Sequence, residues 1–147
     1  MVPPQNNKES EMTIINCTPH QIVMFNPAAV DFNPKTKSYY LNKEIDDLVV
    51  DDQTVFEIFQ PSGIVPRCTQ KETDKGFVNS QTNHKYHIFK MEYGQVDNLP
   101  KEKEETYYIV SALVAQAVKN RHDLLVPTHM VRNKEGQILG CLNFSQI

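Results

Sequence analysis

The chain has 147 residues, and 15 basic against 18 acidic residues give it a formal net charge of −3 at pH 7. This balance excludes a general nucleic-acid coat and a binder of anionic membranes, because both need a basic excess. A small anion held by a few local groups is still compatible with it. No apolar run approaches the roughly 20 residues of a membrane-spanning helix, and the N-terminus shows no basic-then-apolar secretion signal. We therefore expect a cytosolic protein, and the length predicts one domain.

Neither the cysteines nor the acidic residues predict a metal site. Cys17, Cys68 and Cys141 are an odd number without close spacing, and no CxxC motif occurs. Reduced, partly buried thiols are therefore expected, in place of a disulfide framework or a zinc site. The acidic cluster in residues 44–52 lacks the central glycine and the closing glutamate of a calcium loop, which favours a solvated loop. We expect neither a metal nor a cofactor.

The chain begins with a predicted tail and two short strands. Residues 1–12 are polar and contain two prolines, so we expect a flexible tail before a single domain formed by residues 13–147. Residues 13–17 and 21–25 favour strand, and Pro19 bends the chain between them. The two runs therefore form either a hairpin or one kinked strand.

An irregular insertion and two further strands follow. The insertion spans about residues 26–52, and short strands are expected within it at 38–41 and 48–50. Residues 54–60 (TVFEIFQ) are β-branched and aromatic, which predicts an interior strand. Residues 64–70 predict a strand at a sheet edge or with a bulge, because a proline inside the run removes a backbone donor.

The middle of the chain predicts a loop and then a half-buried strand. Residues 71–83 are polar and favour a loop or a loose hairpin. In residues 85–93, Phe89, Met91 and Tyr93 alternate with charged side chains, so that the three share one face of a strand. This is the clearest half-buried strand in the sequence.

Residues 106–110 (TYYIV) are apolar enough for a central strand, and a short helix follows at about 111–119. Ser111 is placed to act as its N-cap, with a hydroxyl that accepts a hydrogen bond from the first turn. Asn120 can adopt the left-handed conformation after the helix. The helix is too apolar to be solvated all round, so we expect it in the core or in a subunit interface.

The chain ends in a predicted hairpin. Residues 130–132 form its first strand, a four-residue loop holds Gly136 at the bulge position, and residues 137–144 return. Gly140 in the returning strand indicates the close approach of a ligand or a backbone. Together the segments predict an α+β fold, in which a β-rich mixed or antiparallel sheet carries one main short helix and a C-terminal hairpin.

Motifs for catalysis are missing from the sequence. It contains no nucleophile elbow, no phosphate loop of the GxxxxGK type and no paired metal ligands. Ser111, His122 and Asp123 resemble a catalytic triad in composition, but a histidine and an aspartate adjacent on one turn rarely orient as a triad. The remaining polar and cationic groups, near the start of the helix, favour an anion or nucleotide binder over an enzyme.

Three stretches resemble a family of small phage proteins. They read IINCTPHQI, PSGIVPR and, most specifically, YYIVSALVAQA…NRHDLLVP…VRNKEGQILGC. They are similar to the Thoeris anti-defence family of nucleotide sponges, named for the bacterial antiviral system that it blocks. The likeness covers most of the chain after the tail, except the insertion at 26–52. Thr128 stands where many relatives have glycine.

The resemblance implies sequestration without catalysis. Members of the family bind a cyclic ADP-ribose-type signal (glycocyclic ADP-ribose) made by bacterial TIR-domain enzymes, so that the defence effector is not activated. Some also sequester cyclic di- or trinucleotides at separate sites. They assemble as dimers or trimers of dimers, with the signal at subunit boundaries. The resemblance therefore implies an oligomer in the cytoplasm of an infected bacterium, without a membrane or long nucleic acid as partner.

The same resemblance suggests which residues bind the ligand. Its two phosphates would be met by the guanidinium groups of Arg121 and Arg132, with Arg67 as a third. Polar side chains expected at the cap and the base edge are Ser111, Asn120, Asp123 and Thr128. Aromatic rings considered for stacking are Tyr107, Tyr108 and Phe89.

Each of these assignments has a structural alternative. Core packing is the favoured alternative for the aromatic rings. Arg67 can equally be a solvated charge at a sheet edge, and Arg121 can form a salt bridge with Asp123. For the whole chain, the alternatives to a sponge are a phage structural or interaction protein without a ligand and, less favoured, a nucleotide hydrolase.

Overall fold

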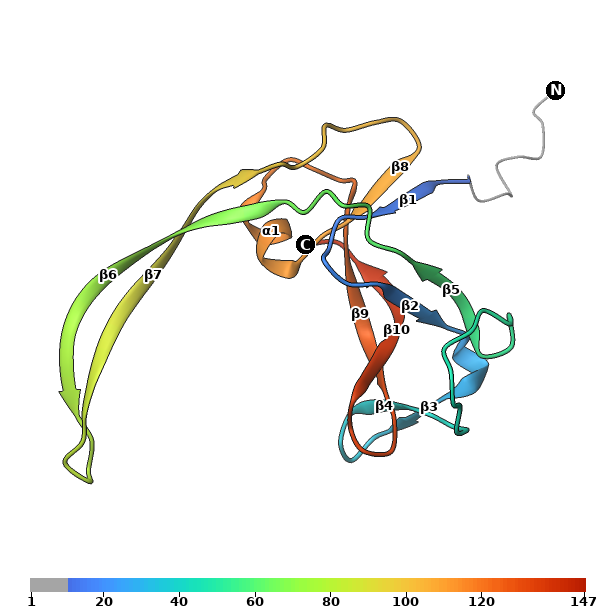
Figure 1. Cartoon of the computed structure of the whole chain (residues 1–147), viewed down its shortest axis with the longest axis horizontal. Helices are drawn as coiled ribbons and strands as arrows, with labels where there is room; N and C mark the ends of the chain where they lie inside the picture. The colour runs from blue at the N-terminus through green and yellow to red at the C-terminus, as the bar shows by residue number, and fades with distance from the viewer. Residues whose placement is uncertain (1–10) are drawn as a thin grey trace.

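The computed structural model describes residues 11–147, so the predicted tail lies almost wholly outside it. Figure 1 shows a curved sheet, the short helix α1 beside it and a long two-stranded arm. The strands are β1 (Thr13–Asn16), β2 (Ile22–Phe25), β3 (Val30–Asn33), β4 (Ser38–Leu41), β5 (Val55–Phe59), β6 (Arg67–Asn79), β7 (Lys85–Asp97), β8 (Thr106–Ile109), β9 (Leu124–Arg132) and β10 (Ile138–Ser145). The helices are the 3-10 turn η2 (Pro27–Ala29) and the α-helix α1 (Ala112–Ala117). Within this part of the chain, no helix is long and apolar enough to cross a membrane.

The main sheet is mixed and closes on itself. Its strands follow the order β1-β8-β9-β10-β2-β5, with parallel β1–β8, β8–β9 and β10–β2 pairs and antiparallel β9–β10 and β2–β5 pairs. A parallel bridge between Asn16 and Pro61 brings the end of β5 back beside β1. The predicted β-rich α+β class with a mixed sheet is thus confirmed.

β1 and β2 do not pair with each other, because β1 pairs with β8 while β2 pairs with β10 and β5, and the turn over residues 17–21 separates them. The hairpin alternative is therefore wrong. The run at 54–60 was expected inside the sheet, but β5 lies at the end of the strand order, where Phe56 is exposed. The aromatic composition of this run indicates that one face of the strand is packed, but it does not distinguish a strand at the edge of a sheet from one at its centre.

The insertion contributes a hairpin to the sheet. β3 and β4 pair with each other, and β4 also pairs in parallel with the C-terminal half of β9. The strand expected at 38–41 is confirmed as β4. The strand expected at 48–50 is wrong, since this stretch has no regular structure and Val49 and Val50 are exposed.

Two clusters of buried side chains form the core. One lies under α1 and joins Cys17, Tyr108, Val110, Val114, Ala115 and Leu124. The other lies under the β3–β4 hairpin and joins Val23, Phe25, Ala29, Leu41, Val55 and Val131. In the second cluster, Gly140 lets β10 approach β2, because a Cβ there would lie 2.4 Å from the carbonyl oxygen of Val23. The close approach expected at Gly140 is confirmed.

The helix cap and the final hairpin turn follow the sequence prediction, but the first strand of the hairpin, expected at 130–132, is β9 and begins already at Leu124. Ser111 is extended and its Oγ accepts a hydrogen bond from the Val114 N–H at 3.2 Å, so it is the predicted N-cap. α1 ends at Ala117, however, two residues earlier than predicted, because Val118 already has an extended backbone. Asn120 has the expected positive φ, and so does Gly136 in the β9–β10 loop.

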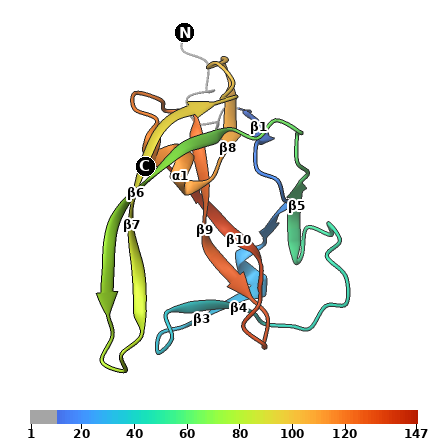
Figure 2. The same ribbon diagram turned by 60° about the vertical axis from the view of Figure 1, so that its left-hand side comes forward.

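β6 and β7 form the arm, which stands away from the sheet in both views (Figures 1 and 2). Each strand has 13 residues, and they pair with each other in a separate two-stranded sheet. Residues 71–83 were expected as a loop or a loose hairpin, and the hairpin is the alternative found, because most of them belong to β6 and the rest lead into its turn. The strand expected at 64–70 begins only at Arg67, but the irregularity expected in it is present as a register shift between Cys68 and Gln70. The polar composition of β6 reflects a ribbon that is solvated along most of its length.

Candidate functional site

A buried asparagine shapes the turn that follows β1. Asn16 is 2% exposed, and its side-chain amide donates to the carbonyl oxygens of His20 (2.8 Å) and Phe59 (2.9 Å). Its Oδ1 accepts from the backbone N–H and the hydroxyl of Thr18. Both polar atoms of this side chain therefore have hydrogen-bond partners, as buried polar groups usually do. Because those partners lie in the turn and at the end of β5, Asn16 holds the turn at Thr18-Pro19-His20 against β5.

The turn forms one wall of a hollow of about 310 Å³, here called the arm-base hollow. The other walls are the start of β6 and the first turn of α1. Its lining residues are Cys17, Thr18, Pro19, Val65, Pro66, Arg67, Cys68, Gln70, Ser111, Leu113 and Val114. The structure thus brings together two of the predicted ligand residues, Arg67 and Ser111.

Arg67 differs from the other two arginines in its surroundings. It is exposed, and within residues 11–147 its guanidinium forms neither a hydrogen bond nor an ion pair, although its strand partner is Asp97. Gln70 and the hydroxyl of Ser111 add groups that can donate to an oxygen. Leu113, Val65 and Pro19 supply an apolar wall. A planar cation beside donors and an apolar surface is suited to an organic anion.

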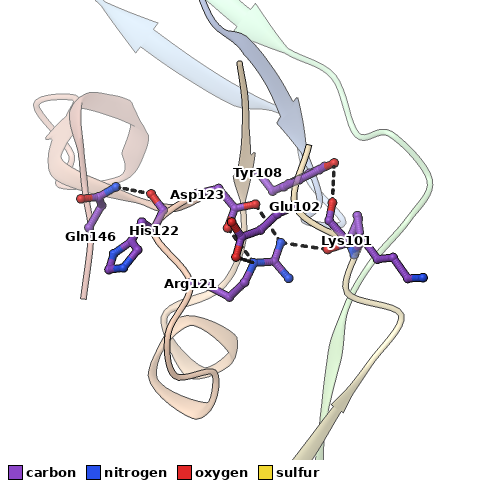
Figure 3. Close-up of polar contacts among 8 residues, drawn as sticks. Lys101, Glu102, Tyr108, Arg121, His122, Asp123 and Gln146 are labelled. Carbon is purple, nitrogen blue, oxygen red and sulfur yellow. Dashed lines mark hydrogen bonds and ion pairs between the residues drawn. The ribbon is translucent and has the colours of Figure 1, made fainter. Parts of the chain in front are cut away.

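Arg121 is held by the protein itself. Its Nε and Nη2 donate to the two carboxylate oxygens of Asp123 at 2.7 and 2.8 Å, and Nη2 also donates to the Pro100 carbonyl oxygen at 2.9 Å. Figure 3 shows this guanidinium between Asp123 and the segment before β8. The hydrogen bonds that Arg121 donates to the Asp123 carboxylate raise the pKa of Arg121. The structural alternative considered for Arg121, a salt bridge to Asp123, is the arrangement present in the structure.

Arg132 also has an internal partner and lies elsewhere. Its Nη1 donates to the Gly136 carbonyl oxygen at 2.7 Å, which closes the β9–β10 loop. Arg121 precedes β9 and Arg132 ends it, and a strand of this length spans about 30 Å. One chain therefore does not bring these two guanidinium groups to the same pyrophosphate.

The other predicted residues are also dispersed. Asn120 is exposed in the turn after α1, Thr128 lies in the middle of β9, Tyr107 is half-buried in β8 and Phe89 is exposed on the arm. Tyr108 is a core residue whose hydroxyl donates to the Lys101 carbonyl oxygen. For Tyr108, the core alternative is confirmed.

A larger hollow, about 440 Å³, lies between residues 41–48 and the β9–β10 loop. It is lined by four carboxylates, Glu44, Asp46, Asp47 and Glu135, and by only two cations, Lys43 and Lys134. Lys134 is already paired with Glu44 at 3.2 Å. This excess of negative charge would repel a phosphate, so the smaller arm-base hollow is the better anion site. Among the described residues, no group of three or more histidine, cysteine or carboxylate side chains could hold a metal ion.

Comparison with protein-family models, curated proteins and solved structures found no match to this chain. The assignment to a sponge family therefore stays a prediction, and the site is argued from geometry. Sequence reasoning missed Thr18 and Gln70 as lining residues. The turn at Thr18-Pro19 was visible in the sequence, but its position opposite Arg67 depends on the bridge between Asn16 and Pro61.

Proposed function

We propose that this protein binds a cyclic ADP-ribose-type nucleotide at the arm-base hollow and sequesters it intact, as a bacteriophage anti-defence protein. The observation that carries the proposal is the guanidinium of Arg67, which lines a hollow and has no partner within residues 11–147. A guanidinium can form two parallel hydrogen bonds to a phosphate. The family resemblance supplies the identity of the expected ligand.

The size of the hollow supports a partial enclosure of the ligand. About 310 Å³ lies at the lower end of the range for small-molecule sites, about 300–1,000 Å³. The pyrophosphate and one ribose would lie against Arg67, Gln70 and Ser111, and the base would project toward Leu113 and Pro19. A sponge must compete with the effector, which requires an affinity of order nanomolar, or about −12 kcal/mol.

The thiol in the hollow supports binding over nucleophilic attack. Burial raises the pKa of Cys17, and the Ser62 hydroxyl lies 3.8 Å from its sulfur. The neutral thiol is a weak nucleophile, because the thiolate is the reactive form. Cys17 thus serves as a small apolar lining group.

The test is calorimetric titration with glycocyclic ADP-ribose, followed by heating and chromatography of the released nucleotide. We expect the wild type to bind the nucleotide tightly and to release it intact. Arg67→Ala should bind it about 10- to 100-fold more weakly, which corresponds to the loss of a hydrogen bond to a charged group. Arg132→Ala is the matched control, since its guanidinium closes a distant loop, and it should bind as the wild type does.

Each alternative function predicts a different result. A hydrolase would release products instead of the intact nucleotide. A structural or interaction protein would give no binding heat while folded, and cyclic di- and trinucleotides would then be titrated in the same way. Equal losses for Arg67→Ala and Arg132→Ala would remove the arm-base hollow as the site.

A further inference from the structure

The outer arm, here residues 74–89, stands away from the rest of the described chain, here called the body (Figure 1). In β7 every residue except Val96 is exposed, although its sequence alternates as a half-buried strand does. The half-buried strand predicted for residues 85–93 is therefore wrong, because no other part of residues 11–147 covers it. A two-stranded hairpin without such a cover is at best marginally stable in water. The order of the outer arm thus depends on contacts between its own two strands.

Four side chains on one face of the outer arm contact one another, and they are here called the His87 cluster. Phe77 lies opposite His87, and Asp74 lies opposite Phe89, so the four share a face. The ring of His87 lies between those of Phe77 and Phe89, with centroids 4.2 Å from each. Nε2 of His87 also pairs with Oδ1 of Asp74. The imidazole therefore joins β6 to β7.

The Asp74 carboxylate links this imidazole to a bulge in β6. The strand register shifts between Asp74 and Phe77, where Gly76 has a φ of 89°. Oδ1 of Asp74 accepts a hydrogen bond from the Gly76 N–H at 2.7 Å, and the same atom pairs with His87. The Gly76 N–H and, after it, the His87 ring lower the pKa of Asp74. The carboxylate is thus charged at neutral pH, and one of its oxygens holds both the bulge and the imidazole.

His87 is the member of the cluster whose charge changes near neutral pH, since histidine is the side chain that titrates between about pH 5 and 8. A protonated ring places a positive charge against the Asp74 carboxylate and between two phenyl faces, and all three attract a cation. A neutral ring keeps the stacking and can still donate one hydrogen bond to Asp74. Loss of the proton therefore weakens the cluster without removing its apolar contacts.

Other charged groups of both signs lie along the arm near His87. They are Glu72, Lys75, Lys85, Lys90 and Glu92. Lys85 opposes a charge on His87, because its Nζ lies 4.5 Å from the centroid of the Phe77 ring. Lys90 and Glu92 pair with each other at 3.6 Å. Within residues 11–147, Asp74 is the group that forms an ion pair with His87, so this contact determines the sign of the effect.

We propose that the His87 cluster is a pH-sensitive clasp, which keeps the outer arm ordered while His87 is protonated and releases it when His87 loses the proton. An exposed ion pair contributes little to a stable domain. The outer arm is a marginal hairpin, however, so a small contribution changes how much of it is ordered. Because the native pairing favours the charged ring, the stabilisation is present at low pH and is lost as the pH rises through the titration of the ring.

The test is an NMR titration of the full chain, without ligand, from about pH 5.5 to 8.5, which covers the usual range of histidine. The ring signals of His87 report its charge, and the backbone carbon shifts of residues 77–79 and 85–89 report how much of the outer arm is strand. The ratio of ordered to disordered outer arm should fall about two- to fivefold, with the midpoint of the His87 ring signals. The signals of β9 should stay constant. The inference does not rest on the proposed ligand.

Two variants fix the charge at this position. His87→Arg keeps a planar cation that can stack on the rings and pair with the carboxylate, so the outer arm should stay ordered over the whole pH range. His87→Gln keeps a hydrogen-bond donor without the charge, so at every pH it should resemble the wild type at high pH. His84→Gln is the matched control. His84 lies in the turn of the arm, where its ring bonds the Thr82 hydroxyl, and its removal should leave the wild-type pH dependence.

The signals of β9 show for each variant whether the body is folded, so a folding defect is distinguished from an open clasp. A wild-type outer arm that is equally ordered at every pH would overturn the proposal. So would a pH dependence that persists in His87→Gln or His87→Arg, or one that disappears in His84→Gln. A change in β9 with the same midpoint would also overturn it, because the pH would then act on the whole domain.

Discussion

The arm and the body carry the same kind of sequence pattern with opposite outcomes. In the body, Ile109 of β8 and Val131 of β9 are fully buried. In the arm, Phe89 of β7 is 46% exposed, although its alternation is the more regular. The body strands have neighbours in the sheet and core clusters beneath them, whereas the arm has only its own second strand. Alternation alone therefore does not show that a strand is covered by the rest of its own chain.

The largest expected effect separates the two regions by stability. Ile109→Ala should cost about 2–5 kcal/mol, because it leaves a cavity in a packed core. Phe89→Ala should change stability by less than about 0.5 kcal/mol, as is usual for a surface position. Urea denaturation measures both. A loss of similar size in the two variants would mean that the arm is packed within one chain.

The arginines allow a second comparison, between a residue that holds the body together and one at the base of the arm. Arg121→Ala should cost about 3 kcal/mol, because it leaves the buried carboxylate of Asp123 without its partner. Arg67→Ala should leave stability within about 0.5 kcal/mol of the wild type. Thermal and urea unfolding measure both effects. If Arg67→Ala were the more destabilising, the guanidinium of Arg67 would have a structural partner. The proposed site would then lack the cation that is expected to bind the phosphate.

Two glycines test how rigid each region is. A Cβ at Gly140 would lie 2.4 Å from the backbone oxygen of Val23, and one at Gly94 would lie 2.5 Å from the hydroxyl of Thr69. Gly140→Ala should cost about 1–3 kcal/mol, because a backbone in a packed sheet cannot move away. Gly94→Ala should cost less, since the Thr69 side chain can rotate. Equal unfolding midpoints for the two variants would contradict this difference.

The three thiols should also differ between the body and the arm, in this case in their reactivity. Burial raises the pKa of Cys141 to about 11 and also raises that of Cys17, whereas Cys68, at the start of the arm, is partly exposed. Because the thiolate is the reactive form, iodoacetamide at pH 8 should modify Cys68 first in the native protein. Mass spectrometry of the labelled peptides measures the order. Early modification of Cys141 would indicate that β10 opens from the sheet.

Much of the C-terminal half could be predicted from its sequence. The N-cap at Ser111, the turn at Asn120 and the close approach at Gly140 each depend on local backbone chemistry, which neighbouring residues determine. The helix end was placed too late because the apolar pattern continues through Val118, which packs against the core from an extended segment.

The arm and the site could not be predicted in the same way, because both depend on pairings between distant segments. β6 has the polar composition of a loop, and only its pairing with β7 makes it a strand. Arg121 and Arg132 were expected to bind the two phosphates of one ligand, but an extended strand separates them. Arg67 and Ser111 meet because the chain crosses from β5 to β6 beside α1, which no local pattern encodes.

The smallest expected effects concern two aspartates, one in each region. The Asp51 carboxylate accepts hydrogen bonds from the N–H groups of Thr54, Val55 and Gln53, which lower its pKa from 3.8. The Asp74 carboxylate accepts from the N–H of Gly76 and bonds His87, which lowers its pKa too. In both cases the native state favours the ionised form. The stabilisation is therefore complete at a pH well above 3.8, the pKa of these carboxyls in the unfolded chain. It is lost as the pH falls below 3.8 and through the lower pKa of the folded state.

The two aspartates should nevertheless report different events, which carboxyl chemical shifts followed by NMR can separate. Protonation of Asp51 removes the hydrogen bonds that hold the turn before β5, so it should weaken the body. Protonation of Asp74 should loosen only the outer arm, because its partners Gly76 and His87 belong to the arm itself. Asp51→Asn and Asp74→Asn are the matched variants, since each keeps an accepting oxygen but removes the charge. If Asp74→Asn changed the acid unfolding of the body as much as Asp51→Asn does, the arm and the body would unfold as one cooperative unit. The two regions would then differ in how their side chains are packed but not in stability.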